Sequence, residues 1–273
     1  MGELNKVYHS DAETLVDLVR YPVTDLDSEK GLTLINNCRR ALQTDSVCVL
    51  KQFILPTAVA TALSELKPRL GGAYYCEKSH NPYLAEDDPA YAASHPRNFQ
   101  QISDLGCLAD DQIDHNSVLR TLYDWPALHE FFAAILEVDQ LYPYADPLGS
   151  LNLNIFQPGH QLGWHYDNAD WVITLMLQPA ESGGIYEYIP ESRQPDDEKF
   201  EQMSKVLDGT HTGVRQLDID AGALILFRGR YTIHQVTPVQ GRTPRLLAVF
   251  SYDTRPGVML TEHNRLLFYG RVA

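Results

Sequence analysis

The sequence predicts a mainly β protein with α elaborations (α+β), in which N-terminal helices pack outside a β-sandwich or jelly-roll core. Two contrasting parts of the chain support this fold class. Apolar residues recur at helical spacing through much of residues 1–139, whereas residues 140–255 hold short alternating or apolar runs separated by Gly, Pro and Asp. A chain of 273 residues can bury a substantial core, and we expect one domain over 1–273.

Helices are expected where apolar residues recur every three or four positions. Such stripes occur in DAETLVDLVRYPV (11–23), LTLINNCRRALQT (32–44), TAVATALSEL (57–66) and residues 116–138. Pro56 and Pro126 each stand where a helix can begin, because proline fits the first helical turn. SVCVLKQF (46–53) is a short β-rich run, so we expect the order strand, turn, helix around Pro56.

Residues 72–113 differ from their surroundings, because they are rich in Gly, Pro, Tyr and small polar residues. We expect one long ordered loop over this segment. Long loops in compact domains often act as lids or binding loops, so we expect a lid, with a cap on the core as the alternative.

Strands are expected in five runs that end at Gly, Pro or Asp. The runs are SLNLNIFQ (150–157), WVITLMLQ (171–178), GGIYEYIP (183–190), ALILFRG (223–229) and RLLAVFSYD (245–253). WVITLMLQ is almost continuously apolar, which is typical of a strand buried on both faces. The charged run PDDEKFEQMSKVLDG (195–209) is expected to be a surface insert, and residues 256–273 a C-terminal extension of the 140–255 core.

Charge and cysteine content narrow the function. A net charge of −14 repels phosphate backbones, so we expect no nucleic-acid partner. The four cysteines form no CxxC pair and are expected to be reduced thiols in a cytoplasmic protein. MGELNKVYHSDAETL has no apolar signal region, and the sequence has no run of about 18 apolar residues that would predict a membrane span. The sequence carries no indication of an oligomeric state.

The stretch GWHYDN (163–168) places His165 and Asp167 two residues apart. In an extended segment such residues point to the same face, about 6–7 Å apart. Both could then reach one metal ion, and a second histidine would complete the facial triad of non-haem Fe(II) enzymes. Alone the pair is weak evidence, because a solvated turn with an incidental histidine fits it as well.

Two downstream residues shift that balance toward a metal site. His234 follows an apolar strand and a Gly/Arg turn, and Arg245 opens another strand after ten intervening residues. An arginine in an apolar strand is costly unless it meets an anion. Its planar fork suits bidentate binding of a carboxylate, such as the distal carboxylate of a dicarboxylic acid.

These residues resemble the HxD…H…R pattern of the Fe(II)/2-oxoglutarate-dependent oxygenases. LNLNIFQPGHQLGWHYDN and IDAGALILFRGRYTIHQVTPV are similar to the two ligand regions of that superfamily, and DSVCVLKQFILPTAVATAL is similar to its N-terminal strand and helix. The resemblance covers residues 140–255 well and residues 45–70 loosely. It implies a double-stranded β-helix (jelly roll, cupin-like) core that uses Fe(II), the co-substrate 2-oxoglutarate, and O2.

The resemblance also implies roles for individual residues. His165, Asp167 and His234 would be the iron ligands. Arg245 would bind the distal carboxylate of 2-oxoglutarate, and Asn154 matches a position that holds the co-substrate in some members. A polar residue on the outer face of a strand is the alternative for Asn154.

A narrower resemblance concerns the reaction. GWHYDN, TLMLQPAESGGIYEYIPESR, HQVTPV and FSYD are similar to the branch that contains free amino-acid hydroxylases and carbon halogenases. Halogenases of this type have Gly or Ala in place of the carboxylate ligand, which frees a coordination position for halide. Because this chain has Asp167, the resemblance implies hydroxylation of an unactivated carbon, with release of succinate and CO2.

The substrate is expected to be a small molecule, in the first place a free amino acid. A zwitterion needs a cation for its carboxylate and an anion or acceptors for its amine. Arg97 is the candidate cation, and Asn168, Asp146 and Trp171 are candidates for lining the pocket. The alternatives are a solvated loop charge for Arg97, a turn residue for Asp146 and core packing for Trp171.

Two other functions stay open at this point. A hydroxylase of prolyl or other peptide side chains would use the same residues. A metal-binding jelly roll without turnover would serve as a sensor or scaffold. The compact, acidic chain favours a small substrate, and the complete ligand set together with Arg245 favours an enzyme.

Overall fold

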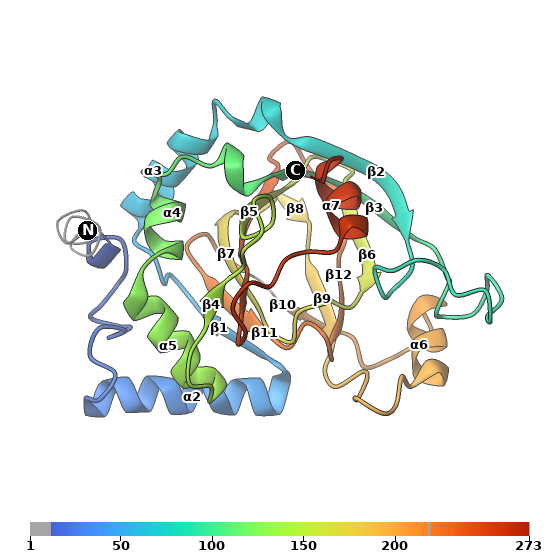
Figure 1. The fold of residues 1–273 in the computed structure, drawn as a ribbon, viewed down its shortest axis with the longest axis horizontal. Coiled ribbons are helices and arrows are strands. Elements are labelled where there is room, and N and C mark those ends of the chain that lie inside the picture. Colours follow the sequence, from blue (N-terminus) through green and yellow to red (C-terminus); the bar gives the residue numbers. More distant parts are fainter. Residues whose placement is uncertain (1–11, 218, 273) are drawn as a thin grey trace.

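The computed structural model describes residues 12–217 and 219–272, and its centre is a curled antiparallel sheet (Figure 1). The eleven strands of this sheet follow the order β1-β11-β7-β14-β5-β3-β6-β12-β9-β10, with β2 paired to β3. Their bounds are β1 Val47–Leu50, β2 Tyr74–His80, β3 Gln101–Leu108, β5 Leu151–Phe156, β6 Gln161–His165, β7 Val172–Gln178, β9 Tyr186–Ile189, β10 Arg215–Leu217, β11 Leu224–Phe227, β12 Ile233–Val236 and β14 Arg245–Phe250. Two further pairs join β8 Ser182–Gly183 to β13 Val239–Gln240, and β4 Tyr142–Pro143 to β15 Tyr252–Asp253.

Helices surround this sheet. They form two groups, which Figure 1 shows on opposite sides of the molecule. The first group is α2 Glu29–Asp45, α3 Pro56–Leu66, α4 Val118–Tyr123 and α5 Pro126–Leu136, and the second is α6 Phe200–Leu207 and α7 Glu262–Tyr269. Short 3-10 turns cover Leu70–Gly72 and Asp110–Gln112. The predicted jelly-roll core with helices outside is confirmed.

Strand β5 shows how the sheet separates core from cavity. Side chains alternate between the two faces of a strand. Leu151, Leu153 and Ile155 are fully buried in the cluster that also contains the apolar faces of α2 to α5. The alternate residues Asn152 and Asn154 line a cavity inside the curl. One face of the sheet is therefore the hydrophobic core, and the other carries polar side chains into the cavity.

The predicted order strand, turn, helix is correct around Pro56. β1 ends at Leu50 and α3 begins at Pro56, while α5 begins at Pro126, so both prolines occupy the first helical turn. The five predicted strand runs contain β5, β7, β9, β11 and β14. All five inner residues of β7 are buried, and Val172 and Gln178 at its ends are half-buried.

The helix predicted over residues 11–23 is wrong for its described part. Residues 12–23 form turns after a short helical end. Val16 makes an isolated bridge to Ile54, and the amide of Asp17 donates to the carbonyl of Phe53 at 3.0 Å. Val16, Tyr21 and Val23 are buried while Val19 is 87% exposed, so pairing with the chain before α3 replaces a helical face.

Residues 72–113 form a hairpin and not one loop. β2 and β3 pair from Tyr74 opposite Cys107 to His80 opposite Gln101, which leaves residues 81–100 as the irregular part. β2 exposes most of its side chains, so no apolar alternation marks it in the sequence. The irregular segment is tied internally, because the Asn98 amide bonds to the backbone of Asp88 and Tyr91.

The charged run 195–209 contains α6, whose Met203 and Val206 are buried against the cluster around Tyr83 and Trp164. The C-terminal extension contains α7, which lies across β2 and β3 (Figure 1). All four cysteines are buried and free, as predicted. None of the helices in the described part of the chain has the length and apolar character that a membrane crossing requires. The extent of a single domain over 1–273 stays a prediction.

Candidate active site

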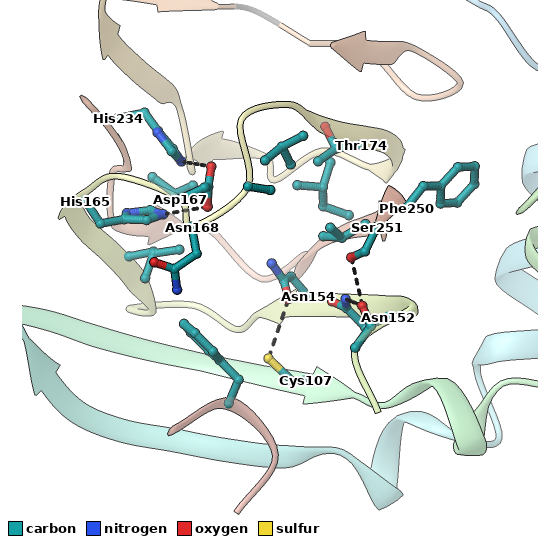
Figure 2. Close-up of a pocket in the computed structure, with 18 of the residues that line it drawn as sticks. Cys107, Asn152, Asn154, His165, Asp167, Asn168, Thr174, His234, Phe250 and Ser251 are labelled. Atoms are coloured by element: carbon teal, nitrogen blue, oxygen red, sulfur yellow. Dashed lines mark hydrogen bonds and ion pairs between the residues drawn. The ribbon is translucent and has the colours of Figure 1, made fainter. Parts of the chain in front are cut away.

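The histidines of the predicted triad are brought together by strand pairing. β6 and β12 are antiparallel neighbours, and His165 lies directly opposite His234. Side chains of opposed residues project from the same face, and the centroids of these two rings are 4.2 Å apart. Asp167 follows the end of β6 by two residues, and the ligand atoms of the three side chains lie within 4.8 Å of one another (Figure 2).

Backbone carbonyls orient both imidazoles. Nδ1 of His165 lies 2.8 Å from the carbonyl oxygen of Gly163, and Nδ1 of His234 lies 2.9 Å from that of Thr232. A carbonyl only accepts, so Nδ1 carries the proton and Nε2 presents a lone pair. Burial, followed by the nearby His234, lowers the pKa of His165 to about 3, and burial lowers the pKa of His234 to about 4. Both rings are neutral near pH 7, which is the form that binds metal.

Asp167 faces these two lone pairs. Its Oδ1 lies 3.9 Å from Nε2 of His165, and its Oδ2 lies 3.3 Å from Nε2 of His234. Oδ2 is buried and has no hydrogen-bond partner, and burial raises the pKa of this carboxyl group. Three atoms with lone pairs thus converge on one point with no proton between them. A cation satisfies all three, and two imidazoles with one carboxylate fit an iron(II) site of the facial-triad type.

The turn before β12 holds the loop that carries Asp167. The amide of Asp167 donates to the carbonyl of Gly229 at 3.2 Å. A Cβ atom at Gly229 would lie 2.8 Å from Cβ of Asp167 and would collide with its carboxylate. Next to it, Arg230 pairs with the carboxylate of Asp170 and donates to the carbonyl of Asn168. The position of the carboxylate therefore depends on Gly229 and Arg230, neither of which was predicted as a site residue.

Arg245 lies on the same cavity as the triad. It is 1% exposed, its Nη1 has no hydrogen-bond partner, and its guanidinium carbon lies 5.3 Å from the centroid of the Phe156 ring. Burial lowers its pKa to about 10, so it is still charged near pH 7. No ion pair among the described residues includes it. A buried arginine without an anion is costly, and a carboxylate ligand would neutralise it.

Tyr186 is a residue of this region that sequence reasoning missed. Its ring stacks on His234 with a centroid distance of 5.3 Å, and its buried hydroxyl has no hydrogen-bond partner. Burial holds the pKa of this hydroxyl well above its usual range, so it stays protonated and can donate. The alternation in GGIYEYIP was the available signal, since it places Tyr186 and Tyr188 on one face of β9.

Asn154 lies on β5 with its side chain in the cavity (Figure 2). The thiol of Cys107, on neighbouring β3, donates to Oδ1 of Asn154 at 3.5 Å. That contact leaves the amide nitrogen of Asn154 free to donate to a ligand. Cys107 was predicted only as a buried thiol, and its cross-strand position beside Asn154 follows from the β3–β5 register.

Asn168 and Trp171 both line the cavity, as the sequence predicts for pocket residues. Trp171 also packs against the hydrophobic core, so its location fits both interpretations and its role in substrate binding stays a prediction. The guanidinium carbon of Arg228 lies 5.4 Å from the centroid of its indole, a cation–π contact that fixes the ring.

Arg97 does not line the cavity. Its guanidinium carbon lies 4.9 Å from the centroid of the Tyr83 ring, and its buried Nη1 has no hydrogen-bond partner. Leu84, next to Tyr83, is part of the cavity wall. Tyr83 and Leu84 pack in different apolar clusters, so the contact with Tyr83 does not place Arg97, in the irregular segment 81–100, at the cavity.

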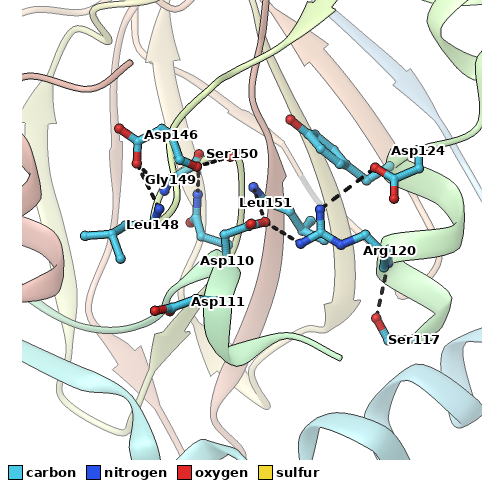
Figure 3. A network of polar contacts seen from close by, with 12 residues as sticks. Asp110, Asp111, Ser117, Arg120, Asp124, Asp146, Leu148, Gly149, Ser150 and Leu151 are labelled. Atoms are coloured by element: carbon cyan, nitrogen blue, oxygen red, sulfur yellow. Dashed lines mark hydrogen bonds and ion pairs between the residues drawn. The ribbon is translucent and has the colours of Figure 1, made fainter. Parts of the chain in front are cut away.

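Asp146 is not a cavity residue, which corrects its prediction as pocket lining. Its carboxylate accepts from the backbone amides of Leu148 and Gly149, and Figure 3 shows both bonds. It also accepts from the amide of Leu260 and pairs with Arg265 at 2.8 Å. With four partners this buried carboxylate has no capacity left for a ligand, and it joins the chain before β5 to the start of α7.

A family model described as halogenase D (HalD) matches residues 35–263. The chain belongs to the halogenase D family. The matched region contains the triad, Arg245 and most of the sheet. No curated protein matches the sequence of this halogenase D family member at a significant level.

Solved structures share the fold of this halogenase D family member. AviO1 from Streptomyces viridochromogenes Tue57 is 16% identical, with a TM-score of 0.56 over 82% of this chain and 96% of that one. The non-haem α-ketoglutarate-dependent carbocyclase SnoK from nogalamycin biosynthesis is 15% identical, with a TM-score of 0.55 over 87% and 92%. An oxidoreductase of the 2OG-Fe(II) oxygenase family from Burkholderia pseudomallei is 12% identical, with a TM-score of 0.53 over 82% and 92%.

The predicted membership of the Fe(II)/2-oxoglutarate oxygenase superfamily is supported by the family match, and the solved structures share its fold. The names of the structural relatives include iron and α-ketoglutarate, the two cofactors that the sequence predicts. The family is named for halogenation, whereas the presence of Asp167 predicts hydroxylation.

Proposed function

We propose that the protein is an Fe(II)/2-oxoglutarate-dependent dioxygenase that hydroxylates an unactivated carbon of a free amino acid or a similar small metabolite. One observation carries the proposal. A single cavity contains three converging lone-pair atoms of two neutral imidazoles and a carboxylate, together with a buried arginine that has no anion. The three lone-pair atoms lack a cation, and the buried arginine lacks an anion. Iron and the carboxylate of 2-oxoglutarate would supply these two partners.

In this proposal His165, Asp167 and His234 hold the iron. The backbone bonds at Nδ1 keep the imidazoles in the ligand tautomer, and the turn at Gly229 keeps the carboxylate between them. When bound, iron would supply the activation of O2: O2, 2-oxoglutarate and the substrate C–H bond give succinate, CO2 and the hydroxylated product, with one oxygen atom in succinate and the other in the new hydroxyl. The protein contributes orientation and exclusion of water.

Arg245 receives the distal carboxylate of 2-oxoglutarate, with the Tyr186 hydroxyl as a second donor. Both donors are buried, both lack partners, and the cavity connects both to the triad. A charge-assisted contact to a carboxylate in such an environment is stronger than one in water. The free amide nitrogen of Asn154 is a third donor on the co-substrate, and Cys107 fixes its orientation.

Asp167 supports hydroxylation over halogenation. A halide needs a coordination position and a place free of negative charge. Here the carboxylate of Asp167 occupies that place. A hydrogen bond from the backbone amide of Asp167 to the carbonyl of Gly229 holds the loop that carries it. The proposal therefore assigns this member of the halogenase D family an oxygen-transferring reaction.

The substrate binds beside the iron against Asn168 and Trp171. Arg97 is the candidate for a substrate carboxylate, because its buried Nη1 has no hydrogen-bond partner and needs an acceptor. Reaching the cavity requires a shift of the segment 81–100, which would then act as the predicted lid. A hydroxylase of peptide side chains is the alternative that the same residues allow.

The test is formation of succinate by the purified protein with Fe(II), 2-oxoglutarate and a panel of amino acids and short peptides. We expect turnover that depends on iron and 2-oxoglutarate and rises with a small substrate. Turnover only with peptides would favour the alternative. No turnover, together with no iron-dependent binding of 2-oxoglutarate, would rule out the enzyme and leave a metal-binding scaffold.

A further inference from the structure

The C-terminal helix α7 forms one wall of the active-site cavity. Three residues of α7 and one that precedes it line the cavity that also contains the triad. They are Asn264, Phe268 and Tyr269 on the helix and Leu260 before it. The helix is fixed at its start, where the hydroxyl of Thr261 accepts from the amide of Asn264 at 3.2 Å. It is fixed along its length against β2 and β3. This wall is therefore a preformed surface against which a substrate can be placed.

Asn264 is the polar side chain of this wall that lacks protein partners. It is 4% exposed, its Oδ1 has no hydrogen-bond partner, and its side-chain amide makes no hydrogen bond to the described residues. Asn154 and Asn152 differ, since Asn154 accepts from Cys107 and Asn152 donates to the carbonyl of Gly149, while Asn168 is exposed. A buried amide oxygen without a partner is unfavourable, and a bound ligand that donates to it removes this cost.

Around Asn264 the described part of the cavity wall carries no charged side chain that could serve a ligand. Among the described lining residues, the acidic and basic side chains besides the two triad imidazoles are Asp167 and Arg245. Both are assigned to the iron and to 2-oxoglutarate. Asp146 stands behind Gly149 and Leu260, but Arg265 and three backbone amides already neutralise it. A charged ligand group placed here would lose its hydration with no opposite charge in exchange.

We propose that the α7 wall binds an uncharged, hydrogen-bonding group of the substrate, a hydroxyl or a carboxamide, and that Asn264 determines this specificity. An amide offers both a donor and an acceptor, which are the two functions that a hydroxyl or a second amide needs. The hydroxyl of Ser251 lies on the same cavity and provides a further polar contact. The inference rests on the proposed function and names the class of substrate for the same site.

Matched substrates test the inference. Glutamine and glutamate have the same shape but differ by a negative charge, and citrulline and arginine have the same shape but differ by a positive charge. Homoserine and 2,4-diaminobutyrate have nearly the same shape and differ by a positive charge, and a comparison of homoserine with glutamine separates hydroxyl from carboxamide recognition. We expect kcat/KM to be at least about 10-fold higher for the neutral member of each pair, since each 10-fold corresponds to about 1.4 kcal/mol. Thermal stabilisation of the protein loaded with Mn(II) and 2-oxoglutarate gives the same ranking by binding alone.

Variants assign the effect to Asn264. Asn264→Asp keeps the shape and introduces a carboxylate, so we expect the preference to shift toward the cationic members, arginine and 2,4-diaminobutyrate. Asn264→Leu removes both hydrogen-bonding functions and should reduce the neutral preference without creating a cationic one. His263→Ala, at the exposed neighbouring position on α7, is the control and should leave the ranking unchanged.

Three results would overturn the inference. They are a wild-type preference for a charged member of the pairs, a ranking that Asn264→Asp leaves unchanged, or no neutral compound that binds or turns over. These results are distinct from failure of the proposed function. If that function is wrong, succinate does not form from 2-oxoglutarate at all, even in the slow reaction without substrate.

Discussion

The two ends of the cavity are built in different ways. At one end His165, His234 and Arg245 lie on paired strands, and their positions follow from backbone register. The residues assigned to the substrate, called the substrate end, are Trp171 at the end of a loop and Asn264 on a helix, and contacts between distant segments position them. A site on strands is held by the whole sheet, whereas a wall made from a loop and a helix can change without disturbing the sheet. The construction thus separates the residues for chemistry from those for substrate recognition.

The largest expected effect comes from removing the one triad ligand that is not on a strand. Asp167→Ala should abolish hydroxylation and weaken metal binding by more than about 100-fold, because loss of even an outer partner of a ligand costs about 10–100-fold. Succinate formation and titration with Co(II) measure the two effects. Glu201→Ala, at an exposed carboxylate on α6, is the control. Full activity of Asp167→Ala would show that the ligand set is wrong.

The strand end of the cavity is tested by replacing its buried cation. Arg245→Met should raise KM for 2-oxoglutarate by roughly 10- to 100-fold, since hydrogen bonds to charged groups contribute about 1.5–3 kcal/mol. The ligand-free variant should unfold at the same or a higher temperature than the wild type, because the buried guanidinium has no anion partner to lose. Calorimetry and steady-state kinetics measure the two quantities. A large loss of stability with unchanged KM would assign Arg245 a purely structural role.

The turn that holds the Asp167 loop is tested with a single methyl group. In Gly229→Ala the added Cβ would lie 2.8 Å from both Cβ of Asp167 and Cγ2 of Val172, so the carboxylate must move. We expect Co(II) affinity to fall by about 10–100-fold, as for other residues that orient a ligand. Gly71→Ala is the matched control, because a Cβ there meets no atom within 4 Å. Equal metal affinity in the two variants would show that the loop position does not depend on this turn.

The smallest expected effect concerns the carboxylate behind the substrate end. Burial alone would raise the pKa of Asp146, but bonds from the amides of Leu148, Gly149 and Leu260 and from Arg265 lower it. A carboxyl group with a lowered folded pKa stabilises the fold above its unfolded pKa of about 3.9, and this contribution is lost as the pH falls through the folded value. The difference in unfolding free energy between wild type and Asp146→Asn should therefore shrink when the pH falls from 6 toward 3. Urea titrations at a series of pH values measure it, and a difference that grows on acidification would contradict the assignment.

The strand end could be predicted from the sequence because its signals are local. HxD spacing, an apolar strand before His234 and an arginine opening an apolar run all depend on side-chain alternation, which β pairing preserves. Asn154 belongs to the same class, since it alternates with the buried leucines of β5.

The substrate end could not be predicted, because its residues carry no local signal of their partners. Asp146 was predicted to line the pocket. Its carboxylate instead accepts from the amide of Leu260 and pairs with Arg265, and both residues are more than 100 positions away in the chain. Asn264 lies in a segment expected only as an extension. The helix predicted over residues 11–23 was wrong for the same reason. The described part of that segment pairs with the chain before α3, a distant contact that its apolar spacing does not indicate.

The close approach of Gly229 to Asp167 also bears on how the reaction could change during evolution. Because Gly229 has no side chain, the carboxylate of Asp167 occupies a space that no other side chain of the turn fills. One nucleotide substitution converts an aspartate codon into one for glycine or alanine. Such a change would leave, beside the same two imidazoles, a gap the size of a carboxylate with no negative charge. A hydroxylating ancestor of this architecture would thus already contain the space for a halide ion.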